Sequence, residues 1–227
     1  MSGDPSRPFD FLRSLAIQEV EVTPTFRHVE IYTLGGLLTL LWHGTRDETR
    51  CVVMGGGAMG GLLGPADGSY HDLGDAFASQ GIGVIRVGYR QPNDLDECTL
   101  DMAAAVDLAS RAGAERFVTV GHSFGGAIAV RTAIALPTMV AGVVTLATQS
   151  AGCEQAERLY GTPMLLIHGD RDEILPVMCS EVVNELAGGQ GELVVLPGAG
   201  HLLNQSGAGD ALRRKLLEWI PPVLAGA

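Results

Sequence analysis

Short apolar runs alternate with longer stretches of mixed polarity along most of the chain. Runs rich in Val, Ile and Leu predict buried strands over residues 51–54, 83–87, 117–120, 142–146, 164–168 and 192–196. The stretches between them predict helices over residues 70–79, 100–109, 124–136, 177–187 and 210–220, with Pro221 and Pro222 ending the last one. Continuous apolar strands that alternate with helices are typical of a parallel sheet covered by helices on both faces.

A different pattern precedes these strands. Residues 28–33 alternate in polarity, Gly35 and Gly36 follow, and residues 37–42 form a second strand-like run. Two such runs around a Gly-Gly pair predict an antiparallel hairpin, because glycine readily adopts the positive φ angles of a tight turn. The sequence therefore predicts an α/β fold with a mostly parallel sheet and an N-terminal antiparallel hairpin. In such sheets ligands bind beyond the carboxyl ends of the strands, so we expect chemistry in the loops there.

Length and charge narrow the class of protein. The 227 residues fit a single domain over residues 1–227, with residues 1–20 as a peripheral segment. The net charge of −11 argues against nucleic acid as a partner. Every apolar run is interrupted before the roughly 20 residues that a membrane span needs. The N-terminus lacks the apolar core of a secretory signal, so we expect a cytoplasmic protein, and homo-oligomerisation stays open.

The cysteines carry no recognisable binding pattern. They lie far apart and form no C-x-x-C pair, at Cys51, Cys98, Cys153 and Cys179. This spacing argues against a disulfide framework and against a zinc site, so we expect reduced thiols and no metal.

The strongest chemical signal is the segment Gly121-His122-Ser123-Phe124-Gly125, which follows an apolar strand and precedes an apolar helix. A serine on a sharp strand-to-helix turn has strained backbone angles, and the flanking glycines remove side chains that would collide there. The turn exposes the hydroxyl group and points the first N–H groups of the helix towards it. An incidental serine at a small-residue helix start is the alternative, but the strand-turn-helix context favours a nucleophile.

A nucleophilic serine needs a base, and a base histidine needs a carboxylate that orients it. Only His168 and His201 follow Ser123. His201 lies in a glycine loop that can reach a neighbouring strand end, whereas His168 ends a strand and is expected to shape a turn. Asp170 and Asp172 are the only aspartates between the serine and His201. Asp172 lies farther into its loop and is preferred as the acid, while Asp170 is suited to cap the turn.

The chemistry also needs N–H donors for the oxyanion that develops on the substrate. The N–H of Phe124 supplies one, and the glycine-rich loop after the strand at 51–54 supplies another through Gly57 or Ala58. A dinucleotide-binding loop is the alternative, but no matching acidic residue and no Gly-Lys-Ser/Thr supports it. Candidate substrate-binding residues, each of which packing would explain equally well, are Met59, Leu62, His71, Tyr89 and Gln149.

Taken in this order, Ser123, Asp172 and His201 resemble the catalytic residues of the α/β-hydrolase superfamily. Residues 168–176, His-Gly-Asp-Arg-Asp-Glu-Ile-Leu-Pro, are similar to its H-G-x-x-D-x-x-x-P segment, which implies Asp172 as the acid. Residues 198–201 are similar to its G-x-x-H segment, and the resemblance extends over most of the chain. The chain departs from the family in two respects: Gly55 and Gly56 stand where members often have His-Gly at the oxyanion loop, and the lid that many members insert is missing.

The resemblance implies an α/β-hydrolase fold with minimal or no lid, because residues 147–161 leave room for only one short helix. It also implies a serine hydrolase that cleaves a small carboxylic ester or thioester through an acyl-enzyme, with no metal or organic cofactor. The expected partner is a small acyl substrate. Dienelactone hydrolases use cysteine as the nucleophile, so Ser123 argues against that activity. Receptor-like members that keep the triad but have little turnover, and peptidase-type members, remain alternatives.

Overall fold

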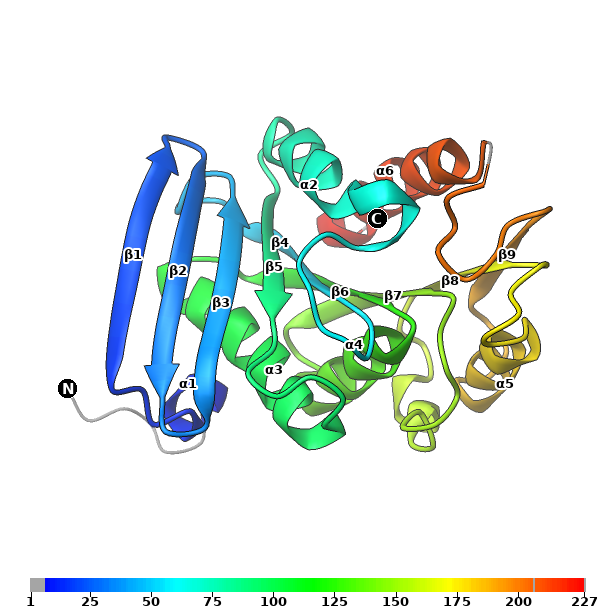
Figure 1. Ribbon diagram of the computed structural model, residues 1–227, viewed down its shortest axis with the longest axis horizontal. Coiled ribbons are helices and arrows are strands. Elements are labelled where there is room, and N and C mark those ends of the chain that lie inside the picture. The colour runs from blue at the N-terminus through cyan, green and yellow to red at the C-terminus, as the bar shows by residue number, and fades with distance from the viewer. Residues whose placement is uncertain (1–6, 206, 227) are drawn as a thin grey trace.

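The computed structural model describes residues 7–205 and 207–226, whose strands form a nine-stranded sheet in the order β1-β2-β3-β5-β4-β6-β7-β8-β9 (Figure 1). The strands are β1 (Ala16–Thr23), β2 (Phe26–Thr33), β3 (Gly36–His43), β4 (Arg50–Gly55), β5 (Gly83–Gly88), β6 (Arg116–His122), β7 (Val140–Leu146), β8 (Met164–Gly169) and β9 (Glu192–Leu196). The helices are α1 (Pro8–Phe11), α2 (Pro65–Ala78), α3 (Leu95–Ala112), α4 (Phe124–Ala135), α5 (Met178–Leu186) and α6 (Ala208–Ala225), with a 3-10 turn η1 (Ala156–Leu159).

The sheet is mostly parallel, as the sequence predicts. Strands β5, β4, β6, β7, β8 and β9 pair in parallel in that order, whereas β1, β2, β3 and β5 pair antiparallel in that order. The predicted hairpin is the β2–β3 pair, in which Thr33 lies opposite Gly36. Strand β1 has no counterpart in the prediction and lies partly in the segment expected to be peripheral. All eight of its residues are exposed, so it shows no apolar face that a pattern would reveal.

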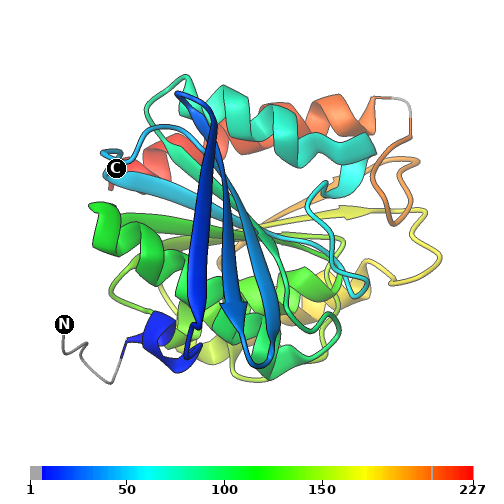
Figure 2. The same ribbon diagram turned by 60° about the vertical axis from the view of Figure 1, so that its left-hand side comes forward.

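Helices cover both faces of the sheet, and a separate core fills each interface. Figure 1 shows α2 and α6 on one face and α1, α3, α4 and α5 on the other, and Figure 2 shows the sheet between these layers. Tyr70 and Phe77 of α2 are fully buried in the first core. Met102 of α3 and Ile128 of α4 are fully buried in the second. The burial of both faces explains why the parallel strands are continuously apolar.

Helix α6 corrects one prediction. Pro221 and Pro222 do not end it, and the helix continues to Ala225. A proline inside a helix lacks an N–H and crowds the preceding turn. Here the last turn is held by tertiary contacts: Leu224 is buried, and Arg116 donates a hydrogen bond to the Val223 carbonyl at 3.1 Å. These contacts outweigh the local preference to stop.

The connection between β7 and β8 contains η1 as its only regular element. It matches the predicted short helix at this place, and the fold therefore has minimal lid structure over the carboxyl ends of the strands. Among the described helices, none combines the length and the apolar character needed to cross a membrane.

Candidate active site

Ser123 occupies a strained turn between β6 and α4. Its backbone angles are φ 57° and ψ −120°, a region that residues other than glycine rarely adopt. The flanking glycines make this turn sterically feasible. A Cβ on Gly121 would lie 1.8 Å from the carbonyl oxygen of Gly125, and a Cβ on Gly125 would lie 2.3 Å from the carbonyl oxygen of Gly56. The glycines are therefore required by close backbone contacts, as the motif predicts.

Three side chains from distant parts of the sequence meet at this turn. His201 Nδ1 lies 2.8 Å from Asp172 Oδ2, and His201 Nε2 lies 3.0 Å from Ser123 Oγ. Because a carboxylate only accepts hydrogen bonds, Nδ1 carries the proton and Nε2 is left as the acceptor for the serine hydroxyl. The arrangement provides a hydroxyl group, a base beside it and an acid that orients the base.

The Asp172 carboxylate is buried and accepts several hydrogen bonds. Oδ1 accepts the backbone N–H groups of Ile174 at 2.9 Å and Leu175 at 2.8 Å, and Oδ2 faces His201. Burial alone raises the pKa of Asp172, but the Leu175 N–H, His201 and the Ile174 N–H outweigh it, so the pKa lies below its usual value. Asp172 is therefore held as a carboxylate at neutral pH.

The alternative base and acid have other partners. His168 is buried, with Nδ1 2.7 Å from the Ser180 hydroxyl and Nε2 2.9 Å from the carbonyl oxygen of Leu175. His168 Nε2 also lies 3.2 Å from Asp172 Oδ2, so His168 supports the turn that carries Asp172. Asp170 accepts the N–H of Gly198 at 2.6 Å. Neither residue is hydrogen-bonded to Ser123 or His201.

His122 is a site residue that the sequence analysis did not single out. Its Nε2 donates to the carbonyl oxygen of His201 at 3.0 Å, and the two imidazole rings lie 5.0 Å apart. Burial lowers the pKa of His122 to about 4, so this imidazole is neutral at neutral pH. His122 thus ties the backbone of the base to the serine turn. Its position beside Ser123 in the motif is the one signal that was available.

The loop that carries His201 is also tied to α2. The N–H of Ala66 donates to the carbonyl oxygen of Leu202 at 2.7 Å. Ala66 and Asp67 have positive φ angles of 52° and 56°, so the chain makes a left-handed turn where α2 begins. On the other side, the N–H of Arg171 donates to the carbonyl oxygen of Ala199 at 2.9 Å. The base therefore lies on a loop fixed by three neighbouring segments.

A cavity of about 510 Å³ opens over Ser123 and His201. It is lined by Gly56, Gly57, Ala58, Met59, Gly60, Gly61, Leu63, Gly64, His122, Ser123, Ile174, His201 and Leu202. Both proposed loop donors, Gly57 and Ala58, thus border it. Phe124 is the first residue of α4, where N–H groups have no partner within the helix. The cavity therefore brings the hydroxyl and the imidazole together with the loop of Gly57 and Ala58, and Phe124 directly follows Ser123 at the start of α4.

The structure separates the five candidate substrate-binding residues. Met59 lines the cavity, and the other four lie outside its lining. Tyr89 is buried, with its hydroxyl 2.0 Å from where a Cβ on Gly55 would lie, so it packs beneath the loop. Leu62 is half-buried and its carbonyl accepts from Arg86. The Gln149 side chain donates to the carbonyl oxygen of Ala151.

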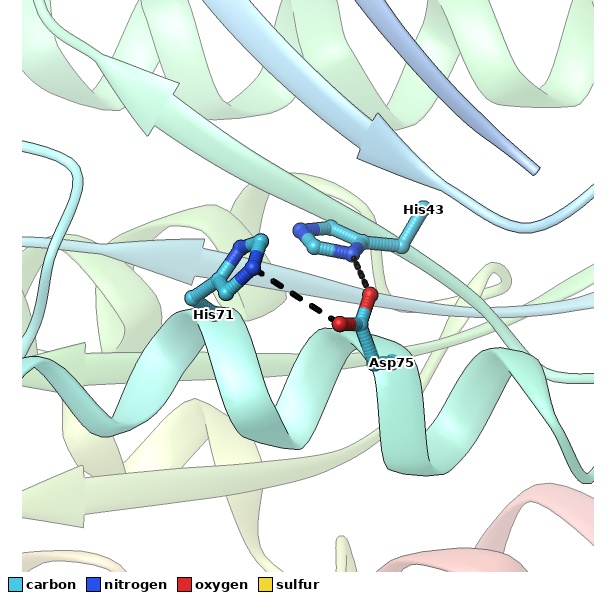
Figure 3. A group of neighbouring side chains, drawn as sticks. All are labelled: His43, His71 and Asp75. Atoms are coloured by element: carbon cyan, nitrogen blue, oxygen red, sulfur yellow. Dashed lines mark hydrogen bonds and ion pairs between the residues drawn. The ribbon is translucent and has the colours of Figure 1, made fainter. Parts of the chain in front are cut away.

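His71, the last of the five, belongs to a polar group on the other side of α2. Figure 3 shows the imidazoles of His71 and His43 near each other, both facing the Asp75 carboxylate. His43 Nδ1 lies 2.8 Å from Asp75 Oδ1, and His71 Nε2 lies 3.7 Å from Oδ2. The imidazole nitrogens and the carboxylate oxygen lie within 4.8 Å of one another, close enough to be considered as ligands of one metal ion.

The hydrogen bonds of this group favour packing over metal binding. Arg86 donates to His71 Nδ1 at 3.2 Å. With Nδ1 acting as an acceptor, Nε2 of neutral His71 carries the proton and has no lone pair for a cation. Arg86 also places a positive charge beside the group. We therefore interpret the group as a link between α2 and strands β3 and β5.

Comparison with known proteins agrees with this fold. A profile of the alpha/beta hydrolase family matches residues 65–210, which is more than half of the chain and includes Ser123, Asp172 and His201. The chain belongs to the alpha/beta hydrolase family. No curated protein matches the sequence. The family assignment therefore rests on the profile and on the architecture of the sheet.

Solved structures resemble this alpha/beta hydrolase over most of its length. Est1E from Butyrivibrio proteoclasticus is 15% identical, with a TM-score of 0.72, over 87% of this chain and 99% of that one. A dienelactone hydrolase from Anabaena variabilis is 19% identical, with a TM-score of 0.73, over 86% and 96%. A monoacylglycerol lipase from Paleococcus ferrophilus is 18% identical, with a TM-score of 0.67, over 84% and 99%. At these identities the likeness concerns the fold.

Proposed function

We propose that this alpha/beta hydrolase cleaves a small carboxylic ester or thioester, with Ser123 as the nucleophile and an acyl-enzyme as the intermediate. The observation that carries the proposal is the continuous hydrogen-bonded series Asp172–His201–Ser123, with distances of 2.8 and 3.0 Å. These are the contacts that acyl transfer by a serine requires, and they open into a cavity large enough for a small substrate.

In the first half of the reaction, His201 Nε2 takes the proton of Ser123 as the serine oxygen attacks the substrate carbonyl carbon. The Asp172 carboxylate stabilises the imidazolium that forms. The N–H of Phe124 and the N–H of Gly57 or Ala58 donate to the oxyanion. His201 then returns the proton to the leaving alcohol or thiol, and the acyl group remains on Ser123.

In the second half, water attacks the acyl carbon while His201 takes one of its protons. The second tetrahedral intermediate is stabilised by the same N–H groups. Its collapse returns the proton to Ser123 and releases the carboxylic acid. Every proton in this cycle moves through His201, so no metal or organic cofactor is needed.

A cytoplasmic location stays a prediction from the sequence.

A fluorophosphonate probe tests the proposal, because it labels a serine only when a neighbouring base activates it. We expect the native protein to be labelled and to hydrolyse 4-nitrophenyl acetate, and we expect Ser123→Ala to do neither. Labelling without turnover on an ester and thioester panel would favour the receptor-like alternative and overturn the hydrolase proposal. Absence of labelling in the native protein would overturn the nucleophile itself.

A further inference from the structure

Four apolar side chains that are exposed to solvent lie around the rim of the cavity over Ser123. Met59, Leu63, Ile174 and Leu202 are 95%, 66%, 69% and 54% exposed, and all four line this one cavity. Single exposed apolar residues are ordinary on a protein surface, but a group of them around a cavity indicates a binding surface. The four residues come from three different loops, so the surface is produced by the fold rather than by one apolar segment.

The Met59 side chain projects from a tight turn. The N–H of Gly60 donates to the carbonyl oxygen of Gly57 at 2.8 Å, which places Met59 at the third position of the turn. Gly60 has a φ angle of +71°, and a Cβ there would lie 3.0 Å from Pro92, so the turn is closely fitted to its surroundings. A methionine side chain is flexible and adapts to the shape of an apolar ligand. The turn therefore presents an adaptable apolar side chain beside Gly57 and Ala58.

The charges around the cavity point to an uncharged ligand. Of the residues that the structure describes, no lysine or arginine lines it. Arg171 and Glu173 line an adjoining hollow, which therefore carries one charge of each sign. The whole chain carries a net charge of −11. A substrate with a carboxylate would enter this cavity against the net charge of the protein, and no cation among the described residues of the cavity lining would pair with it.

From these observations we infer that the substrate is an uncharged ester with an aliphatic acyl chain, which lies along the rim formed by Met59, Leu63, Ile174 and Leu202. The inference rests on the proposed function and adds the substrate class. The acyl part is the one that stays on Ser123 after the leaving group departs, so its chain remains on the rim during both steps. Substrates with a distal carboxylate are rejected because they leave a charge without a partner on an apolar surface.

An acyl-chain series tests the apolar rim. We expect kcat/KM for 4-nitrophenyl esters to rise from acetate to hexanoate by about twofold to fourfold per methylene, since the rim removes part of each methylene from water. The double variant Met59→Ser/Leu63→Ser should flatten this rise. These two residues are preferred for substitution because Ile174 binds Asp172 through its N–H and Leu202 adjoins His201.

A matched control separates the rim from general surface effects. Leu34 is 87% exposed at the turn between β2 and β3 and does not line the cavity, so Leu34→Ser should keep the native chain-length profile. Thermal unfolding of each variant checks that the fold is retained. A flat series in the native protein, or an unchanged slope in the double variant, would overturn the inference.

A charge test is independent of chain length. Mono-4-nitrophenyl adipate and 4-nitrophenyl hexanoate have acyl parts of equal length, and only the adipate carries a distal carboxylate. We expect the native protein to prefer the hexanoate by at least about tenfold in kcat/KM, and Leu63→Arg to narrow this ratio by supplying a cation. A preference for the adipate in the native protein would contradict the inference.

The outcome for the proposed function is read separately, from fluorophosphonate labelling of Ser123. Labelling and turnover that Ser123→Ala abolishes, together with a flat acyl series, would leave the proposed function intact and overturn only the substrate class. Turnover that survives Ser123→Ala would overturn both.

Discussion

Asp172 shows how a single carboxylate organises the side chains around the base. Two backbone N–H groups, from Ile174 and Leu175, fix one oxygen, and the imidazoles of His201 and His168 share the other. The orientation of the carboxylate is therefore set before a substrate arrives. Because Oδ2 is directed at Nδ1 of His201, the lone pair on Nε2 is directed at the serine.

This geometry makes Asp172 and Asp170 a matched pair for substitution. Asp172→Asn replaces the carboxylate that faces His201 Nδ1 by an amide, which disturbs the tautomer of His201. We therefore expect kcat to fall by up to about 10⁴. Asp170→Asn keeps an oxygen that can accept the Gly198 N–H, so kcat should remain near the native value. Steady-state kinetics on one ester decide the assignment, and the opposite pattern would make Asp170 the acid.

The buried imidazole of His122 predicts a specific response to acid. Its folded-state pKa of about 4 lies below the usual histidine pKa of 6.5, so the unfolded chain binds the proton more readily. The free energy of unfolding should therefore fall as pH decreases from 6.5 to 4. The contribution of His122 to this loss reaches up to about 3 kcal/mol.

In His122→Phe this contribution is absent. At neutral pH the variant loses the hydrogen bond to the His201 carbonyl, but its stability should decline less steeply between pH 6.5 and pH 4. His43 and Asp172 titrate in both proteins, so their effects cancel in the comparison. Urea unfolding at several pH values measures the difference, and parallel pH profiles for the two proteins would contradict the prediction.

At the scale of residues, the sequence indicates local geometry where a turn constrains residue type. The strained turn at Ser123 could be predicted because it needs glycines at two fixed positions, and both meet backbone oxygens at close range. His71 shows the limit of such reasoning. It follows the glycine-rich loop closely in sequence, yet α2 directs it to His43 and Arg86. Its contacts are set by helix orientation, which local sequence does not contain.

At the scale of elements, α4 and the loop after β4 are in direct backbone contact. Gly125 lies in the first turn of α4, and a Cβ there would lie 2.3 Å from the Gly56 carbonyl oxygen and 2.9 Å from that of Gly55. Gly56 precedes the residues that are proposed to bind the oxyanion. The position of this loop therefore depends on the absence of a side chain on the neighbouring helix.

Gly125→Ala should push α4 away from the loop after β4. The added methyl group meets backbone atoms that cannot rotate away, so we expect a loss of about 1–3 kcal/mol in the free energy of unfolding. Fluorophosphonate labelling of Ser123 should also slow, because the loop is displaced.

Gly209→Ala in α6 is the matched control. A Cβ at Gly209 meets Ala66 at 3.4 Å, an ordinary contact, and its backbone does not require glycine. Its free energy of unfolding should stay within about 0.5 kcal/mol of the native value. Urea unfolding compares the two variants, and equal stabilities would show that the close approach at Gly125 is unimportant.

Elements could be predicted where burial leaves a pattern. The six parallel strands are mostly apolar, and each lies within a few residues of its predicted position, although the edge strand β9 is only partly buried. Helix α3 begins at Leu95, earlier than expected, because the Asp94 side chain accepts the N–H groups of Asp96 and Glu97. The end of α6 depends on contacts with β6 and β7, which no local rule contains.

On the scale of the whole molecule, the net charge of −11 acts on every approaching ligand. An uncharged ester is unaffected by this field, whereas an anionic ester is repelled until salt screens the charge. We expect kcat/KM for mono-4-nitrophenyl adipate to rise a few-fold between low and physiological ionic strength, and that for 4-nitrophenyl hexanoate to change little. Stopped-flow or plate assays across a salt series measure both, and equal salt dependence would argue against long-range repulsion.

The short connection between β7 and β8 has a consequence for the acyl-enzyme that we propose at Ser123. With only η1 between these strands, no segment of this connection must open before a second nucleophile reaches the ester bond at Ser123. Partition between water and a competing alcohol is then governed by their concentrations and not by the timing of a gate. Bulk solvent is the more abundant acceptor, so the architecture favours release of the free acid over transfer of the acyl group to another hydroxyl.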